Sequence, residues 1–431
     1  MVQEKEVIAK ISRRFVPLMI AAAFLAYLDR VNVSFAALGM NADIGLSSAA
    51  YGFGAGIFFV TYVLVEVPSN LILARVGARR WLARIMFTWG VISLCMIFVR
   101  GEYSFYVLRA LLGVAEAGLY PGIVFFLSIW FPAEYRARIG GLFWLSIPLS
   151  SVIGAPVSGL LLGLDGVFGL RGWMWLFIVE ALPTLVLSFV LLRVVTDSPA
   201  EAGWLAPAER DWLVQRMAAE HAAAEDDGGR GPLAALSDPR VWALGLVCFG
   251  AVIINYGLSF FLPQIIKGFG LSNTAVGFVT ALPYVAAVFG ILASGHLSDA
   301  TSSRRGCAGA MIVLCAVCLA VSTLFAAPVY EMAALVAAGF FMFSYLPAFW
   351  AIPQGFLRGP ALAVGIAAIN AIANVGGFVG PYLMGYLHDE TGSFADGLRI
   401  LALIGAIGVL LLLVVRPRSQ AVLQPAASRA H

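Results

Sequence analysis

The sequence predicts an all-α membrane protein in which twelve transmembrane helices form two pseudo-symmetric six-helix bundles. Hydrophobic residues make up 61% of the 431 residues and charged residues only 12%, whereas soluble domains have roughly 45–50% and 25%. The mean hydropathy is +0.92, and apolar runs long enough to cross a bilayer, about 20 residues each, follow one another along the chain. A single long polar stretch separates the first six runs from the last six.

The twelve apolar runs are bounded by charge clusters and by Gly and Pro turns. We expect helices near residues 15–39, 50–73, 81–99, 103–131, 139–163, 173–193, 241–266, 273–297, 306–327, 330–357, 360–388 and 396–415. The first run follows four basic residues, but it is long, contains Asp29 and Arg30 and lacks a small-residue cleavage site. It is therefore predicted to be a retained helix rather than a signal peptide.

The polar stretch predicts the domain organisation. We expect a first bundle, a cytoplasmic linker and a second bundle at residues 1–193, 194–240 and 241–431. Within the linker, 206–224 has the pattern of a short amphipathic surface helix. Two related halves that meet at a site near the bilayer midplane are typical of alternating-access transporters.

The positions of Lys and Arg predict the orientation of the helices. Basic residues concentrate at both termini, in the linker and in the turns on the same side of the membrane. The loops on the other side contain only Arg100, Arg171, Lys267 and Arg399. Because basic loops stay in the cytoplasm, both termini are expected to be cytoplasmic.

Two loops and several helices resemble a known family. The turns that begin at Arg75 and at Gly295 resemble the GxLxDRxGRR motif of the major facilitator superfamily, with Ala74 where the motif has Asp. The chain is more closely similar to the anion:cation symporter family of proton-coupled organic-anion permeases. The matching residues are Tyr27, Asp29, Arg30, Asn32, Tyr62, Glu66, Pro68, Ser69, Asn70, Arg109, Gly113, Glu116, Ala117, Gly118, Pro121, Trp130, Phe131, Pro132, Arg136, Trp350, Pro353, Asn370, Asn374, Gly376, Gly377, Phe378, Gly380 and Pro381. The resemblance implies a bacterial inner-membrane carrier for tartrate, phthalate, hexonates, hexuronates or similar acids.

Four charged residues are expected to lie deepest within the apolar runs: Asp29, Arg30, Arg109 and Glu116. A charged side chain at the bilayer centre costs about 2.5 kcal/mol or more, so these residues need a reason to be there. Arg109 and Glu116 are two helical turns apart and therefore share a face. Two interpretations stay open, a transport site or structural ion pairs between the first and fourth helices.

The chemistry of these residues favours anion transport with protons. A guanidinium remains charged and can hold a carboxylate through two parallel hydrogen bonds, so Arg30 and Arg109 are predicted to bind substrate. Asp29 and Glu116 are predicted to couple protons, because a carboxyl group in lipid is less costly when it is neutral. We expect a bound anion to weaken the hold of Arg109 on Glu116 and so to favour protonation of Glu116.

Other residues are predicted to complete the substrate site or to gate it. The further substrate-binding residues are expected to be Tyr62, Asn32, Tyr256, Trp350 and Asn374. The gate is expected to contain salt bridges among Glu66, Arg75, Arg79, Asp299 and Arg304. Glu180 is interpreted as a packing or interfacial residue.

The sequence thus predicts a secondary transporter that imports a small organic acid anion with protons. An exchanger or an efflux carrier of the same fold stays open, and neither the substrate nor the proton stoichiometry is fixed. An intramembrane enzyme is disfavoured because no HExxH or GxSxG motif occurs, and the cysteines lack CxxC spacing. We expect no metal, cofactor or nucleic acid, and a monomer whose partners are the organic anion, protons and membrane lipid.

Overall fold

The computed structural model describes residues 4–225, 232–301, 303–413 and 415, with side chains except at 137–138, 221–225, 232–233, 299 and 359–360. The helices are α1 (Glu4–Ile44), α2 (Ser48–Val76), α3 (Ala78–Cys95), α4 (Glu102–Glu116), α5 (Leu119–Trp130), α6 (Ala133–Leu162), α7 (Gly172–Val194), α8 (Pro207–Glu225), α9 (Pro239–Lys267), α10 (Asn273–Thr301), α11 (Arg304–Ser322), α12 (Pro328–Met342), α13 (Leu346–Trp350), α14 (Gly359–Thr391) and α15 (Phe394–Leu410). Together they provide twelve candidate membrane spans within the described residues, which confirms the predicted all-α membrane fold.

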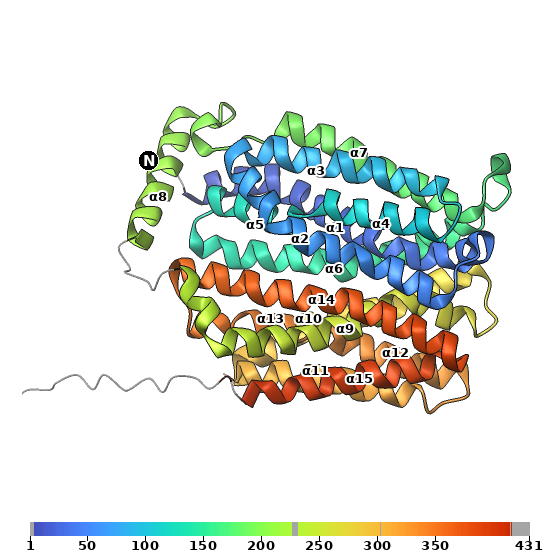
Figure 1. Ribbon diagram of the computed structural model, residues 1–431. Coiled ribbons are helices and arrows are strands. Elements are labelled where there is room, and N and C mark those ends of the chain that lie inside the picture. Colours follow the sequence, from blue (N-terminus) through green and yellow to red (C-terminus); the bar gives the residue numbers. More distant parts are fainter. Residues whose placement is uncertain (1–3, 226–231, 302, 414, 416–431) are drawn as a thin grey trace, which may run out of the picture.

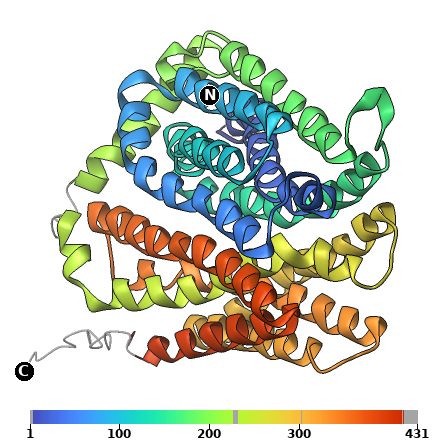
Figure 2. The same ribbon diagram turned by 45° about the vertical axis from the view of Figure 1, so that its right-hand side comes forward.

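The spans lie side by side in two groups. In Figure 1 the helices of the first half, up to α7, lie above those of the second half, from α9 onward, and Figure 2 shows the same division after rotation. The predicted surface helix is present as α8, and it lies at one end of the bundle together with the start of α1 (Figure 1). We call this end the linker side.

Helix α8 is attached to the first half by ion pairs. Arg136 pairs with Glu220 at 2.7 Å, and Arg216 pairs with Glu134 at 3.2 Å. Lys10 near the start of α1 pairs with Glu209. Such exposed pairs contribute about 0.2–1 kcal/mol each, so several together hold a short helix against the bundle.

The two halves meet through close backbone contacts away from the linker side. Helix α2 packs on α14, and α6 packs on α10. A Cβ atom added to Gly385 would lie 2.0 Å from the Ser48 carbonyl oxygen, and one added to Gly159 would lie 2.8 Å from the Gly277 Cα. Small residues allow membrane helices to approach this closely. The bundle is therefore closed at the end opposite the linker side.

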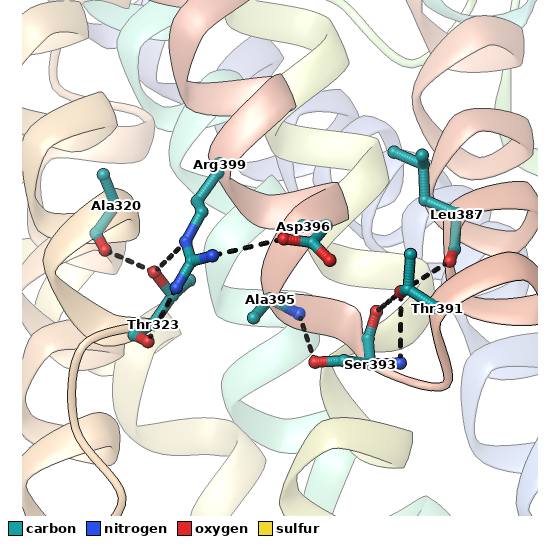
Figure 3. A network of polar contacts seen from close by, with 8 residues as sticks. All are labelled: Ala320, Thr323, Leu387, Thr391, Ser393, Ala395, Asp396 and Arg399. Atoms are coloured by element: carbon teal, nitrogen blue, oxygen red, sulfur yellow. Dashed lines mark hydrogen bonds and ion pairs between the residues drawn. The ribbon is translucent and has the colours of Figure 1, made fainter.

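The turn between α14 and α15 at that same end is held by side-chain hydrogen bonds, shown in Figure 3. Ser393 accepts a hydrogen bond from the Ala395 backbone N–H and so caps α15. Arg399 donates to Asp396 and to the Thr323 hydroxyl at the end of α11, at 3.2 and 2.9 Å. These contacts tie α11, α14 and α15 together, far along the sequence from the buried charges.

Two predicted spans are broken in the structure. The run 103–131 is divided into α4 and α5 at Gly118, whose φ of 92° is left-handed. The break leaves the Ala117 carbonyl outside the helix, where it accepts a hydrogen bond from Ser69 at 2.7 Å. Pro121 in the first turn of α5 supports this start, since the first turn needs no backbone donor.

The fourth span of the second half is broken in the corresponding place. The run 330–357 is divided into α12 and α13 around Phe343–Tyr345, again with a proline, Pro347, in the next first turn. Interrupted helices at matching positions of two halves are a structural sign of a transport site. A prediction based only on continuous hydrophobicity missed both breaks.

Gly113 and Gly339 lie where these broken spans pack against neighbouring helices. A Cβ atom at Gly113 would lie 2.2 Å from the Phe58 carbonyl oxygen of α2. At Gly339 it would lie 2.4 Å from the Pro283 carbonyl oxygen of α10. The halves therefore use the same glycine contact in corresponding spans.

We expect Gly113→Ala to lower the thermal unfolding temperature of the purified protein, because the added methyl group would clash with the α2 backbone and overpacking costs about 1–3 kcal/mol. Gly140→Ala is the matched control, since nothing lies within 4 Å of a Cβ atom at Gly140. Tryptophan fluorescence during heating in detergent would measure both. Equal stability of the two variants would contradict the packing described here.

Candidate functional site

Buried charges gather in the first half of the bundle. Among the residues with described side chains, the buried charged residues are Asp29, Arg30, Arg109, Glu116 and Glu180, each at most 6% exposed. They come from α1, α4 and α7. This arrangement requires that the charges find partners inside the protein.

Arg30 is at the centre of the site. Its guanidinium forms an ion pair with Glu116, the last residue of α4 before the break. It also donates a hydrogen bond to the Tyr256 hydroxyl at 3.1 Å, from α9 in the second half. Four aromatic rings surround it, with centroids 5.0–5.7 Å from the guanidinium carbon: Phe58, Phe59, Tyr62 and Tyr120. Arg30 therefore links the first span to the fourth and the first half to the second.

Arg109 has a different environment. Its guanidinium donates to the backbone carbonyls of Ala55 at 3.1 Å and Gly54 at 3.4 Å. No carboxylate lies within ion-pair distance of it in the part of the chain that the structure describes. The expectation that Arg109 holds Glu116 is thus wrong for this conformation, because Arg30 on the neighbouring helix occupies that carboxylate.

The two arginines nevertheless flank one ring. The Phe58 centroid lies 5.0 Å from the Arg30 guanidinium carbon and 5.2 Å from that of Arg109. Both cations therefore lie against the same aromatic ring. Among the described residues, Arg109 contacts backbone carbonyls and the Phe58 and Phe260 rings but no carboxylate within ion-pair distance.

Asp29 is held by α3 and by its own helix. It accepts hydrogen bonds from the Trp89 indole N–H at 2.5 Å, from the Ser93 hydroxyl and from the Asn32 amide at 3.2 Å. Trp89 and Ser93 did not figure among the expected site residues. Their spacing of four residues, which places them on one face of α3, is the sequence signal that could have indicated them.

The remaining predicted substrate residues fall into two groups. Tyr62 and Tyr256 lie beside the Arg30 guanidinium, as described above, and Asn32 binds Asp29 instead. Trp350 in α13 packs against Phe349 and its indole N–H has no hydrogen-bond partner. Asn374 in α14 is half-buried. The structure shows no contact of Trp350 or Asn374 with the two arginines.

Among the predicted gate residues whose side chains the structure describes, Glu66, Arg75, Arg79 and Arg304, no salt bridge forms in this conformation. Glu66 instead accepts a hydrogen bond from Asn370 of α14 at 3.4 Å. Arg79 donates to the Leu192 carbonyl and Arg304 to the Ala351 carbonyl, whereas Arg75 is exposed. The side chain of Asp299 lies outside the described residues. Arg79 at the start of α3 and Arg304 at the start of α11 therefore bind carbonyl groups near the ends of α7 and α13.

Within the described residues, the site combines a cation without a carboxylate in ion-pair distance, Arg109, with the Arg30–Glu116 ion pair and the separately hydrogen-bonded Asp29 carboxyl. The described residues contain no group of three or more His, Cys, Asp or Glu side chains that could hold a metal ion.

Comparison with known proteins agrees with this fold. A family model of the Major Facilitator Superfamily matches residues 19–275 and 244–431. The chain is 16% identical to a bacterial homologue of the human lysosomal transporter Spinster in an inward-facing, occupied conformation, with a TM-score of 0.75 over 93% of this chain and 96% of that one. It also resembles the inward-open xylose transporter XylE of E. coli, with a TM-score of 0.74, 15% identity and coverage of 94% and 96%.

Full-length relatives are more similar in sequence. A protein of Agrobacterium vitis named "Putative tartrate transporter" is 48% identical over 96% of this chain and 95% of its own length. The "Quinolone resistance transporter" of Acinetobacter baumannii is 40% identical over 96% and 95%. The "Inner membrane transport protein RhmT" of Escherichia coli K12 is 37% identical over 95% and 95%. Taken with the twelve spans and the buried site between two halves, these matches show that the chain is an integral membrane protein that belongs to the Major Facilitator Superfamily, whose matched members are transporters and not enzymes.

Proposed function

We propose that this protein is a secondary transporter of the bacterial inner membrane that imports a small organic acid anion together with protons. The observation that carries the proposal is the buried Arg109 guanidinium, which has no carboxylate within ion-pair distance among the described residues and contacts the same Phe58 ring as Arg30. A buried, unpaired cation is costly unless a ligand neutralises it. A relative named for tartrate supports a carboxylate as that ligand.

The substrate carboxylate would lie between the two arginines. Arg109 would hold it through two parallel N–H···O bonds, and Arg30 would approach it across the Phe58 ring. Tyr62 and Tyr256 would donate hydrogen bonds to hydroxyl groups or to a second carboxylate, since their rings already lie at Arg30. This geometry favours a small polar acid over a bulky molecule.

Proton coupling would follow from competition for Arg30. When the substrate draws the guanidinium away, Glu116 loses its counterion while it remains buried. A lone carboxylate in lipid is far more costly than a neutral carboxylic acid, so Glu116 would take up a proton. Asp29, held by Trp89, Ser93 and Asn32, would supply a second proton site.

Alternating access would require the contacts between the halves to open. The glycine contacts close the end opposite the linker side, and Arg30 and Tyr256 join the halves near the centre. With the termini in the cytoplasm, as the distribution of basic residues predicts, this conformation would be the inward-facing one. A substrate that displaces Tyr256 from Arg30 would loosen the central contact and permit the change.

A second candidate is export by the same fold. The relative named for quinolone resistance, 40% identical to this chain, supports an efflux carrier or an exchanger.

Uptake into proteoliposomes with an imposed inward proton gradient distinguishes these functions. Import predicts accumulation of a labelled acid, with tartrate, sugar acids and aromatic acids as the panel, and collapse of that accumulation by a protonophore. Transport that requires a counter-anion, or an opposite gradient, would contradict proton-coupled import.

We expect Arg109→Lys to weaken substrate binding by about tenfold or more. Lysine keeps the charge but lacks the planar fork that binds both carboxylate oxygens. Isothermal titration with the best acid from the panel would measure the dissociation constant, and exposed Arg100→Lys is the matched control. Wild-type affinity in Arg109→Lys would remove this residue from the site.

We expect Glu116→Gln to abolish accumulation driven by a pH gradient, because glutamine resembles a carboxyl group that never releases its proton. Counterflow of labelled substrate, which needs no net proton movement, should persist. Asp29→Asn should likewise lower the accumulation driven by a pH gradient and keep counterflow. Glu102→Gln, at the exposed start of the same helix, is the control. Proton-driven uptake at the wild-type level in both Glu116→Gln and Asp29→Asn would refute the assignment.

A further inference from the structure

Glu180 is a buried acid that the site described above does not use. It lies in α7, is 3% exposed and belongs to a span that crosses the membrane. The Ser158 hydroxyl of α6 donates to its Oε1 at 2.8 Å, whereas its Oε2 is buried without a hydrogen-bond partner among the described residues. No basic side chain in the described part of the chain forms an ion pair with it. An ionised carboxylate in lipid without a cationic partner is costly, whereas a protonated carboxyl is much less so.

Asn32 connects Glu180 to Asp29. Its Nδ2 donates to Asp29 at 3.2 Å, and its side chain also lies next to the Glu180 carboxyl. The Oδ1 atom of Asn32 is buried and has no donor. Asn32 Oδ1 and Glu180 Oε2 are thus both buried without a hydrogen-bond partner among the described residues. A proton on Glu180 Oε2 would give that carboxyl an O–H group that can donate to the Asn32 side chain.

The surroundings of Glu180 show which groups act on it. From α1 it is faced by Asp29 and Asn32, and from α6 by Ser158. The nearest polar groups of α3, Trp89 and Ser93, are bonded to Asp29. Asp29 is therefore the charged group that influences the ionisation of Glu180. Two adjacent carboxyl groups do not both ionise readily in a medium of low polarity.

A small pocket between the halves reaches this group of residues. Asn32 and Ser158 line it together with Ser259, Thr280 and Tyr284 of the second half. Tyr284 donates to Ser259 at 2.8 Å, and the Thr280 hydroxyl is buried without a partner. The pocket thus brings hydroxyl groups of both halves to the two residues that contact the Glu180 carboxyl. Proton exchange at Glu180 would then respond to the relative position of the halves.

We propose that Glu180 is a further proton-binding residue that shares a proton with Asp29, with the Asn32 amide oriented between them. In the conformation seen here Glu180 carries the proton on Oε2 and Asp29 is ionised. When the O–H bond at Glu180 breaks and one forms at Asp29, the amide turns, so that its nitrogen donates to the ionised Glu180 and its oxygen accepts from Asp29. This inference rests on the proton coupling proposed above.

The test is Glu180→Gln in proteoliposomes, with uptake measured as a function of pH. We expect the ratio of proton-driven accumulation to counterflow to fall about tenfold and the uptake rate to lose its wild-type pH profile. Glu331→Gln, an acid at the start of α12 outside this group, should leave both measurements unchanged. A residue that only supports packing would lower both kinds of transport together and keep the pH profile.

A second variant covers the case in which Glu180→Gln does not fold. Ser158→Ala removes the hydroxyl that donates to the Glu180 carboxylate, so the alkaline limb of the uptake profile should move to higher pH. Wild-type pH profiles in both variants, or in Ser158→Ala alone if Glu180→Gln does not fold, would overturn the inference while leaving proton-coupled import intact. If the wild-type protein shows no response to a proton gradient, the proposed function itself fails.

Discussion

The ion pair between Arg30 and Glu116 is the interaction on which the central arrangement depends. A guanidinium that is 6% exposed in a membrane protein needs hydrogen-bond acceptors, because each unpaired polar group in lipid costs roughly several kcal/mol. Glu116 supplies the charge and Tyr256 supplies an acceptor from the other half. The same atoms therefore determine the packing of the first span, the contact between the halves and the place where an anion would compete.

The broken fourth span explains why this pair can act as more than a structural contact. Glu116 is the last residue of α4, and the chain turns at Gly118 before α5 begins. Carbonyl groups at the break have no partner within the helix and find one in a neighbouring side chain, as Ala117 does in Ser69. The corresponding break in the second half carries no charge. The halves thus share a scaffold, whereas the charge chemistry belongs to the first half.

The halves touch differently at the closed end of the bundle and near its centre. At the closed end they touch through glycines and backbone atoms, and the Asp389 carboxylate of α14 accepts hydrogen bonds from the Ser48 and Ala49 backbone N–H groups at 3.0 and 2.7 Å. Near the centre the Arg30 guanidinium donates a hydrogen bond to the Tyr256 hydroxyl. Under the proposed transport function, a change in charge at Arg30 would act directly on this central contact.

The sequence by itself determined the class of protein, the number of spans and the identity of the deeply buried charges around Asp29 and Glu116. The reason is that the bilayer acts on every segment separately, so length and polarity decide each span without knowledge of its neighbours. Only the tertiary structure decided which acid meets which arginine. Asp29 and Arg30 are adjacent in sequence, but successive residues of a helix point about 100° apart, so Asp29 reaches α3 and Arg30 reaches α4. The position of Glu180 beside Asn32 was decided in the same way, by packing between helices, whereas Gly118 and Pro347 mark the breaks in the two spans locally.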